Sequence, residues 1–130
     1  MNFDDIPQSE LAESLRIPPS STDSEASVLG GLLMDNRGFD IVGDLLEPTD
    51  FYRREHALIF QAASAMIVAG KPADVITIFE HFRDAGKTEE IGGLVYLNQL
   101  AQYVPSMANL RRHAEIVHEK AMLRKLLQAS

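Results

Sequence analysis

The chain has 130 residues, a length that suits one compact domain, and 45% of them are hydrophobic, as in ordinary globular proteins. It contains no cysteine, which excludes a disulfide framework, thiol catalysis and cysteine-ligated metal sites. The net charge is −7: residues 1–50 carry 11 acidic side chains against two basic ones, whereas residues 51–130 carry 8 against 10. Because nucleic-acid affinity depends largely on Lys and Arg, the chain is a poor candidate for binding DNA by itself.

Residues 1–21 are expected to form a flexible acidic tail. The tail ends in Pro18-Pro19-Ser20-Ser21, a stretch that favours extended backbone, although Ile6, Leu11 and Leu15 leave open a turn or two of helix. It lacks the basic and apolar regions of a signal peptide, and no run in the chain reaches the roughly 18 apolar residues that span a bilayer. We therefore expect a soluble, cytoplasmic protein without a membrane partner. The acidic residues of the tail are Asp4, Asp5, Glu10 and Glu13.

Two helices are predicted next. Thr22 and Glu25 have the spacing of a capping box, and the apolar residues after them predict a helix over residues 23–34. Asn36 is expected to cap a second, short helix that ends before Pro48.

The third helix is expected to be the central one. Thr49 or Asp50 is predicted to cap it, and residues 57–68 are apolar nearly all round, which is typical of a helix buried on every side. Gly70 and Pro72 end it.

A fourth helix is predicted between Asp74, as its cap, and Gly86, which ends it. The β-branched run at residues 75–78 leaves a strand open, but the spacing of the apolar residues favours a helix. A short turn over residues 88–91 leads to Gly92-Gly93, a fifth helix follows from Leu94 to Ala101, and Pro105 breaks it. The helical apolar positions of the fourth helix are Val75, Ile78, Phe79 and Phe82.

The sixth helix, predicted over residues 107–127, has two apolar stripes that lie about 130° apart at 100° per residue. One stripe, Leu110, Ala114, Val117 and Ala121, can pack on the domain's own core. The other, Ile116, Leu123 and Leu127, needs a second partner, either another subunit or a following segment of chain. We therefore expect residues 128–130 to be a truncated end, and the last helix to lead into a truncated helical hairpin. The predicted fold is all-α, a compact bundle of about six helices.

No motif indicates a cofactor or a catalytic site. Gly86-Lys87-Thr88 resembles the end of a phosphate-binding loop, but position 81 is His81 rather than glycine, and the triplet follows a predicted helix instead of a strand. His113 and His118 are five residues apart, and His56 and His81 lie on other elements, so solvated or capping histidines are expected rather than metal ligands.

The basic residues of the last helix are interrupted by Glu115 and Glu119, which favours a solvated helix with i, i+4 ion pairs over a phosphate-binding surface.

Seven segments together resemble the N-terminal domain of the DnaB family of hexameric replicative DNA helicases, and the resemblance covers roughly residues 18–127. Ser24 and Ala26 depart from residues that are common in that family, and the family's ATPase motor is absent from the chain. The segments are residues 19–33, Asp50-Phe51-Tyr52, His56-Ala57-Leu58-Ile59-Phe60, Asp74-Val75-Ile76-Thr77, Gly92-Gly93-Leu94-Val95-Tyr96-Leu97, Pro105-Ser106-Met107-Ala108-Asn109-Leu110 and Ile116-Val117-His118-Glu119-Lys120-Ala121.

This resemblance implies a non-catalytic collar domain over residues 22–127, which pairs into dimers within a hexameric ring and docks primase during DNA replication. In such helicases ATP, Mg²⁺ and 5′→3′ unwinding belong to the motor domain, and single-stranded DNA is held only by the full-length ring. Ile116, Leu123 and Leu127 are then the candidate self-association residues. Tyr103, Arg111 and Arg112 are candidate primase contacts, because exposed aromatic and Arg side chains are common at interface hot spots. The alternative is a free-standing helical regulator or phage-encoded adaptor of the same fold.

Overall fold

The computed structural model describes residues 20–129, which contain six α-helices, three short 3₁₀ helices and no strand. The predicted all-helical fold is therefore confirmed. The predicted flexible tail, residues 1–21, lies outside the described residues apart from its last two. The elements are α2 (Thr22–Met34), η2 (Asn36–Gly38), α3 (Phe39–Val42), η3 (Pro48–Asp50), α4 (Arg54–Val68), α5 (Val75–Asp84), η4 (Thr88–Ile91), α6 (Gly93–Leu100) and α7 (Met107–Ala129).

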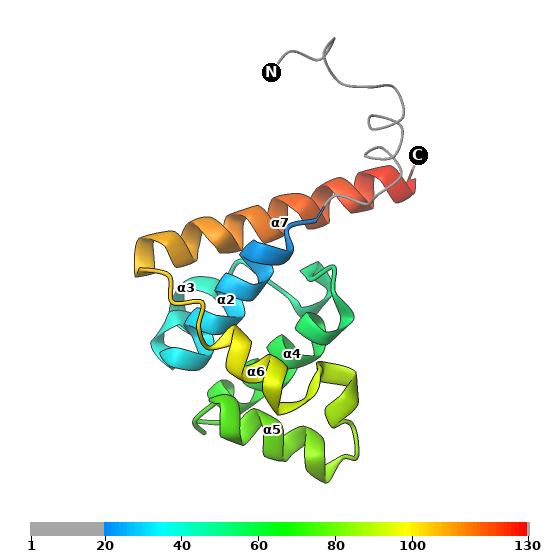
Figure 1. Cartoon of the computed structure of the whole chain (residues 1–130). Helices are drawn as coiled ribbons and strands as arrows, with labels where there is room; N and C mark the ends of the chain where they lie inside the picture. Colours follow the sequence, from blue (N-terminus) through cyan, green and yellow to red (C-terminus); the bar gives the residue numbers. More distant parts are fainter. Residues whose placement is uncertain (1–19, 130) are drawn as a thin grey trace.

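Helix α2 is the central element of the fold. It packs against α7 on one side and against α4 and α6 on others, and α5 lies at the opposite end of the molecule from α7 (Figure 1). The prediction that the helix over residues 57–68 is buried on every side was wrong, because Gln61, Ala65 and Val68 of α4 are exposed. The residues of α2 that are buried are Ser24, Glu25, Ala26, Ser27, Val28, Leu29, Gly30, Leu32 and Leu33.

The caps of the first two helices differ from the prediction. Ser21, not Thr22, caps α2, since its side chain accepts a hydrogen bond from the Ser24 backbone N–H. Asp35 caps η2 in the same way, while the Asn36 side chain bonds to both the N–H and the C=O of Ala73, at 3.0 and 2.7 Å. Asn36 thus ties the first part of the chain to the loop before α5.

The segment before α4 is also more broken than predicted. The second helix splits into η2 and the four-residue α3, which ends at Val42. Thr49 and Asp50 belong to η3, where Asp50 accepts a hydrogen bond from the Glu47 N–H, and α4 begins only at Arg54. Pro48 is the first residue of η3, and its fixed φ suits the first turn of a helix.

Residues 75–84 form a helix, α5, and not the alternative strand. Asp74 and Thr77 make a reciprocal capping box at its start. Gly86 has a φ of +69°, and the Lys87 N–H donates to the Phe82 carbonyl, so Gly86-Lys87-Thr88 closes a helix end. The triplet therefore lacks the strand-to-helix setting that a phosphate-binding loop requires.

Candidate protein-interaction site

Helix α7, with 23 residues, is the longest helix in the part of the chain that the structure describes. Ser106 begins it, since the Ser106 hydroxyl accepts a hydrogen bond from the Asn109 N–H. The helix packs against α2, α3 and η3 along one edge of the body, and its C-terminal end projects past the helices beneath it (Figure 1). The first predicted stripe is confirmed as the buried one, with side chains at most 2% exposed: Leu110, Ala114, Val117 and Ala121.

The second predicted stripe lies on the outer side of α7. Ile116 is half-buried, whereas Leu123 and Leu127 are 45% and 61% exposed. Two further apolar residues extend this surface, Met122 at 45% and Leu126 at 65%. Sequence reasoning missed both because, at 100° per residue, they belong to neither predicted stripe. Their apolar character on a helix with a covered inner face was the available signal. Together, Ile116, Met122, Leu123, Leu126 and Leu127 form what we call the outer face of α7.

Polar contacts hold the C-terminal half of α7 against the body. Arg124 donates to the Asp50 carbonyl oxygen at 2.6 Å, and its guanidinium lies 5.4 Å from the centre of the Tyr52 ring. His118 Nδ1 lies 3.7 Å from an Asp50 carboxylate oxygen. These contacts leave the outer face pointing away from the core.

The three candidate primase residues lie around the connection from α6 to α7. Tyr103 is 40% exposed, and its backbone packs directly over Gly30 of α2. Arg111 and Arg112 are exposed on the first turns of α7, and Arg112 pairs with Glu119 at 3.4 Å. Further apolar residues of α6 and of the connection to α7 are also exposed: Leu94, Val95, Val104 and Met107.

A buried polar network beneath these surfaces was not predicted. Glu25 is 1% exposed, and its carboxylate accepts hydrogen bonds from the Tyr52 and Arg53 N–H groups, at 2.7 and 3.3 Å. It also bonds to Nδ1 of His56, which is fully buried, at 2.8 Å. The expectation of solvated or capping histidines was therefore wrong for His56. The predicted capping role of Glu25 within its own helix was wrong too, because Glu25 satisfies the N–H groups that lead into α4 instead.

The network ends at Tyr96 on α6. The Tyr96 hydroxyl lies 2.5 Å from His56 Nε2, and the two rings are stacked at 5.8 Å. A histidine with its proton on Nδ1 donates to Glu25 and accepts from Tyr96, so one tautomer satisfies both bonds. Burial raises the pKa of the Tyr96 phenol above its ordinary value. These contacts connect α2, α4 and α6. We therefore interpret the network as holding the three helices in position and not as a substrate site.

No helix within residues 20–129 is long and apolar enough to cross a bilayer. Within the same residues, no group of three or more His, Asp or Glu side chains comes close enough together to hold a metal ion.

These features define a small all-helical domain with an apolar helix face exposed on its surface. Residues 17–119 match the family model described as the DnaB-like helicase N terminal domain, and the chain belongs to this family.

Full-length relatives agree with this assignment. The chain is 38% identical over 125 residues to the replicative DNA helicase DnaB of Pasteurella multocida, which covers 96% of the chain and 27% of the helicase. It is 39% identical over 117 residues to DnaB of Geobacillus stearothermophilus, covering 90% of the chain and 26% of the helicase. The chain thus spans about a quarter of the length of these relatives.

Solved structures share the fold. The N-terminal domain of DnaB helicase from Mycobacterium tuberculosis matches with a TM-score of 0.82 and 39% identity, over 87% of this chain and 82% of that one. The corresponding Helicobacter pylori domain, described together with its interactions with primase, matches with a TM-score of 0.70 and 22% identity over 95% and 92%.

Proposed function

We propose that this chain acts as the non-catalytic N-terminal collar domain of a replicative DNA helicase, where it associates with copies of itself and docks primase. ATP hydrolysis with Mg²⁺, grip on single-stranded DNA and 5′→3′ unwinding then belong to the other three-quarters of the helicase. The site of action is the replication fork in the cytoplasm. The observation that carries the proposal is the outer face of α7, which exposes apolar side chains while the opposite side of the same helix is fully covered.

Self-association is the first part of the proposal. An exposed apolar surface of several neighbouring side chains is typical of a protein interface, because water is released when a partner covers it. Met122, Leu123 and Leu126 lie near the C-terminal end of α7, which ends at Ala129. That end of the helix projects past the body (Figure 1), so a second copy can approach it without displacing the core. A two-fold contact between two α7 helices would bring the same residues of each copy together.

Sedimentation velocity of Leu123→Asp against the unaltered chain tests this part. The unaltered chain should sediment faster as its concentration rises, and Leu123→Asp should stay monomeric because a carboxylate would have to be buried in the interface. Val68→Asp is the matched control, since Val68 is 76% exposed at the end of a different helix. A chain that remains monomeric at every concentration would count against self-association through α7.

Docking of primase is the second part. Tyr103 offers an exposed ring at a helix junction, and Arg111 and Arg112 follow it on α7, a combination that suits a protein interface hot spot. The interactions with primase described for the H. pylori domain support the choice of partner.

Calorimetric titration with the C-terminal domain of a bacterial primase tests this second part. Tyr103→Ala combined with Arg111→Ala should weaken binding at least about tenfold, the effect of removing about 1.4 kcal/mol. A comparable pair far from the junction, Val68→Ala with Arg83→Ala, should leave the affinity unchanged. Equal affinity for both pairs would remove Tyr103 and Arg111 from the proposed interface.

A further inference from the structure

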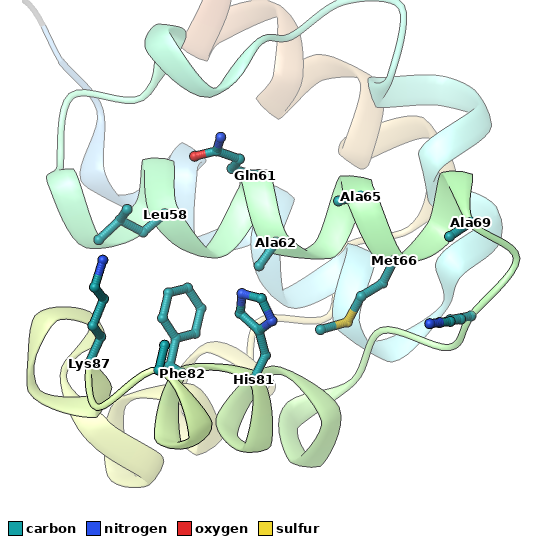
Figure 2. Close-up of a pocket in the computed structure, with 11 residues that line it drawn as sticks. Leu58, Gln61, Ala62, Ala65, Met66, Ala69, His81, Phe82 and Lys87 are labelled. Carbon is teal, nitrogen blue, oxygen red and sulfur yellow. The ribbon is translucent and has the colours of Figure 1, made fainter.

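A groove of about 470 Å³ runs between α4 and α5, at the end of the molecule away from α7. Its wall on the α4 side runs from Leu58 to Ala69, just past the end of that helix. His81 and Phe82 point toward this wall from α5, and Met66 reaches down beside them (Figure 2). Seven of the 11 residues that line the groove are apolar, so it can take up the apolar side chains of an occupant.

The charged residues of this groove are both lysines, opposite in sign to the chain's net charge of −7. Lys87 lies at the end beside Leu58 (Figure 2). Lys71 lies at the other end, because it follows Ala69 by two residues and its backbone N–H donates to the Met66 carbonyl at 2.8 Å. None of the residues that line the groove carries a carboxylate. This lining favours an acidic occupant with an apolar side.

The two lysines have no acidic partner within the part of the chain that the structure describes. Neither Lys71 nor Lys87 forms an ion pair with a carboxylate among residues 20–129. By contrast, Arg83 on α5 pairs with the neighbouring Asp84 at 3.4 Å. The ammonium groups at both ends of the groove are therefore available to the carboxylates of another molecule.

The shape of the groove fits a helix. It follows α4 from Leu58 to Ala69, roughly 16 Å at 1.5 Å per residue, which is the length of about 11 residues of a second helix. An extended peptide usually binds by adding a strand to a sheet edge, and the described residues contain no strand. A helix satisfies its own backbone hydrogen bonds and can place one apolar row of side chains in a groove between two other helices.

We propose that the α4–α5 groove is the docking site for an acidic amphipathic helix of a partner protein. The apolar face of this helix covers Leu58, Met66 and Phe82, and carboxylates near its two ends pair with Lys71 and Lys87. No residue that lines the groove belongs to α6, to α7 or to the connection between them. The groove is therefore separate from the surfaces proposed for self-association and for primase, and it adds a third interaction to the function proposed above.

A methyl NMR titration of the full chain with a synthetic peptide tests this inference. The peptide is a stapled helix of about 11 residues with capped ends, leucines at i, i+3, i+4 and i+7, and glutamates on the remaining surface. The methyl signals of Leu58 and Met66 should shift until they saturate, and those of Val95 on α6 should not. Lys71→Glu combined with Lys87→Glu should weaken binding at least about tenfold, because the reversed charges repel the peptide. Both lysines are exposed, so their reversal leaves the core undisturbed.

Matched controls separate charge from apolar contact. Lys120→Glu combined with Lys125→Glu makes the same change of charge on α7 and should leave the affinity unchanged. The same peptide with lysine in place of every glutamate should bind the unaltered chain at least about tenfold more weakly. Ala65→Phe, at an exposed position of the α4 wall, should block the groove and remove the shifts, whereas Ala108→Phe on α7 should not. Circular dichroism checks that every variant keeps the helical fold.

Three outcomes would overturn the inference. The first is that the peptide does not shift the signals of Leu58 and Met66 in the full chain. The second is that binding survives the reversal of Lys71 and Lys87, or that the acidic and basic peptides bind equally well. The third is that the same methyl signals move when the chain alone is diluted, because the groove would then be occupied by a second copy of the chain.

Discussion

Glu25 shows how a single residue organises the interior of this domain. Its carboxylate is 1% exposed and accepts hydrogen bonds from two backbone N–H groups and from His56. The N–H groups belong to Tyr52 and Arg53, at the entry to α4, where the helix dipole also favours a negative charge. A buried carboxylate is tolerated here because each of its partners is a hydrogen-bond donor that would otherwise lack an acceptor.

Removal of Glu25 should therefore destabilise the domain strongly. We expect Glu25→Ala to lower the free energy of unfolding by about 3–5 kcal/mol, because His56 and two backbone N–H groups lose their acceptor in the interior. Glu25→Gln should fall between Ala and the natural residue, since an amide oxygen replaces part of the carboxylate. Urea unfolding followed by circular dichroism measures both, and Glu80→Ala, on the exposed side of α5, should change stability by less than about 0.5 kcal/mol. A small effect of Glu25→Ala would show that water replaces the carboxylate.

Tyr96 should make stability depend on alkaline pH. Burial raises the pKa of its phenol in the folded state, so the folded chain holds this proton more tightly than the unfolded chain. The resulting stabilisation is present below the ordinary phenol pKa of about 10 and is lost as the pH rises through the folded value. Urea unfolding across this pH range should show a steeper loss for the natural chain than for Tyr96→Phe. Parallel pH profiles for the two would contradict the assignment.

At the scale of elements, the packing of α2 depends on a residue without a side chain. A Cβ at Gly30 would overlap the carbonyl oxygens of Leu100 and Tyr103, which are backbone atoms and cannot turn away. The neighbouring Gly31 is less constrained, because a Cβ there would meet side-chain atoms of Leu110 and Pro105 at 3.1 Å. The close approach at Gly30 sets the path of the connection between α6 and α7, and so the position of Tyr103.

Gly30→Ala should destabilise the domain by about 1–3 kcal/mol, because the overlap outweighs the better helix propensity of alanine. Gly31→Ala should stay close to the natural stability, since its propensity gain offsets a milder contact. Thermal unfolding of the two variants under the same conditions measures the difference. Equal melting temperatures would mean that α2 can shift away from the connection at little cost.

At the scale of the whole molecule, α7 combines two roles. Its inner side covers the core through Leu110, Ala114, Val117 and Ala121, and its outer face is exposed. Arg124 lies in the same turns of α7 as the outer face. Its contacts with the Asp50 carbonyl and the Tyr52 ring anchor these C-terminal turns to the body.

Loss of this anchor should loosen the end of α7. We expect Arg124→Ala to lower the free energy of unfolding by about 1–2 kcal/mol, from the lost charged hydrogen bond and the cation–π contact. Hydrogen exchange of the amides after Ala121 should quicken, while exchange around Leu110 should not change. Lys125→Ala is the control: it removes a neighbouring charge but keeps the Arg124 contacts, so the exchange rates should not change. Unchanged exchange in Arg124→Ala would show that Leu110, Ala114 and Val117 hold α7 unaided.

The sequence by itself determined the all-helical class, the course of α5 and α7, and the buried stripe of α7. Those features follow from helical periodicity and from caps such as Asp74 and Gly86, which act between residues a few positions apart. The seven DnaB-like segments indicated the family as well. The candidate residues for self-association and primase binding remain predictions, because exposure alone does not identify a partner.

Only the tertiary structure decided which groups Glu25 and Asn36 bond to, and that a groove lies between α4 and α5. Glu25 meets His56 across 31 residues, and Asn36 meets Ala73 across 37, so no local pattern distinguishes them from ordinary capping residues. The groove exists because the alanines of α4 face α5 across a gap that their methyl groups do not fill. Each of these features depends on how separate helices pack, and the free energy of that packing is not encoded in any one segment.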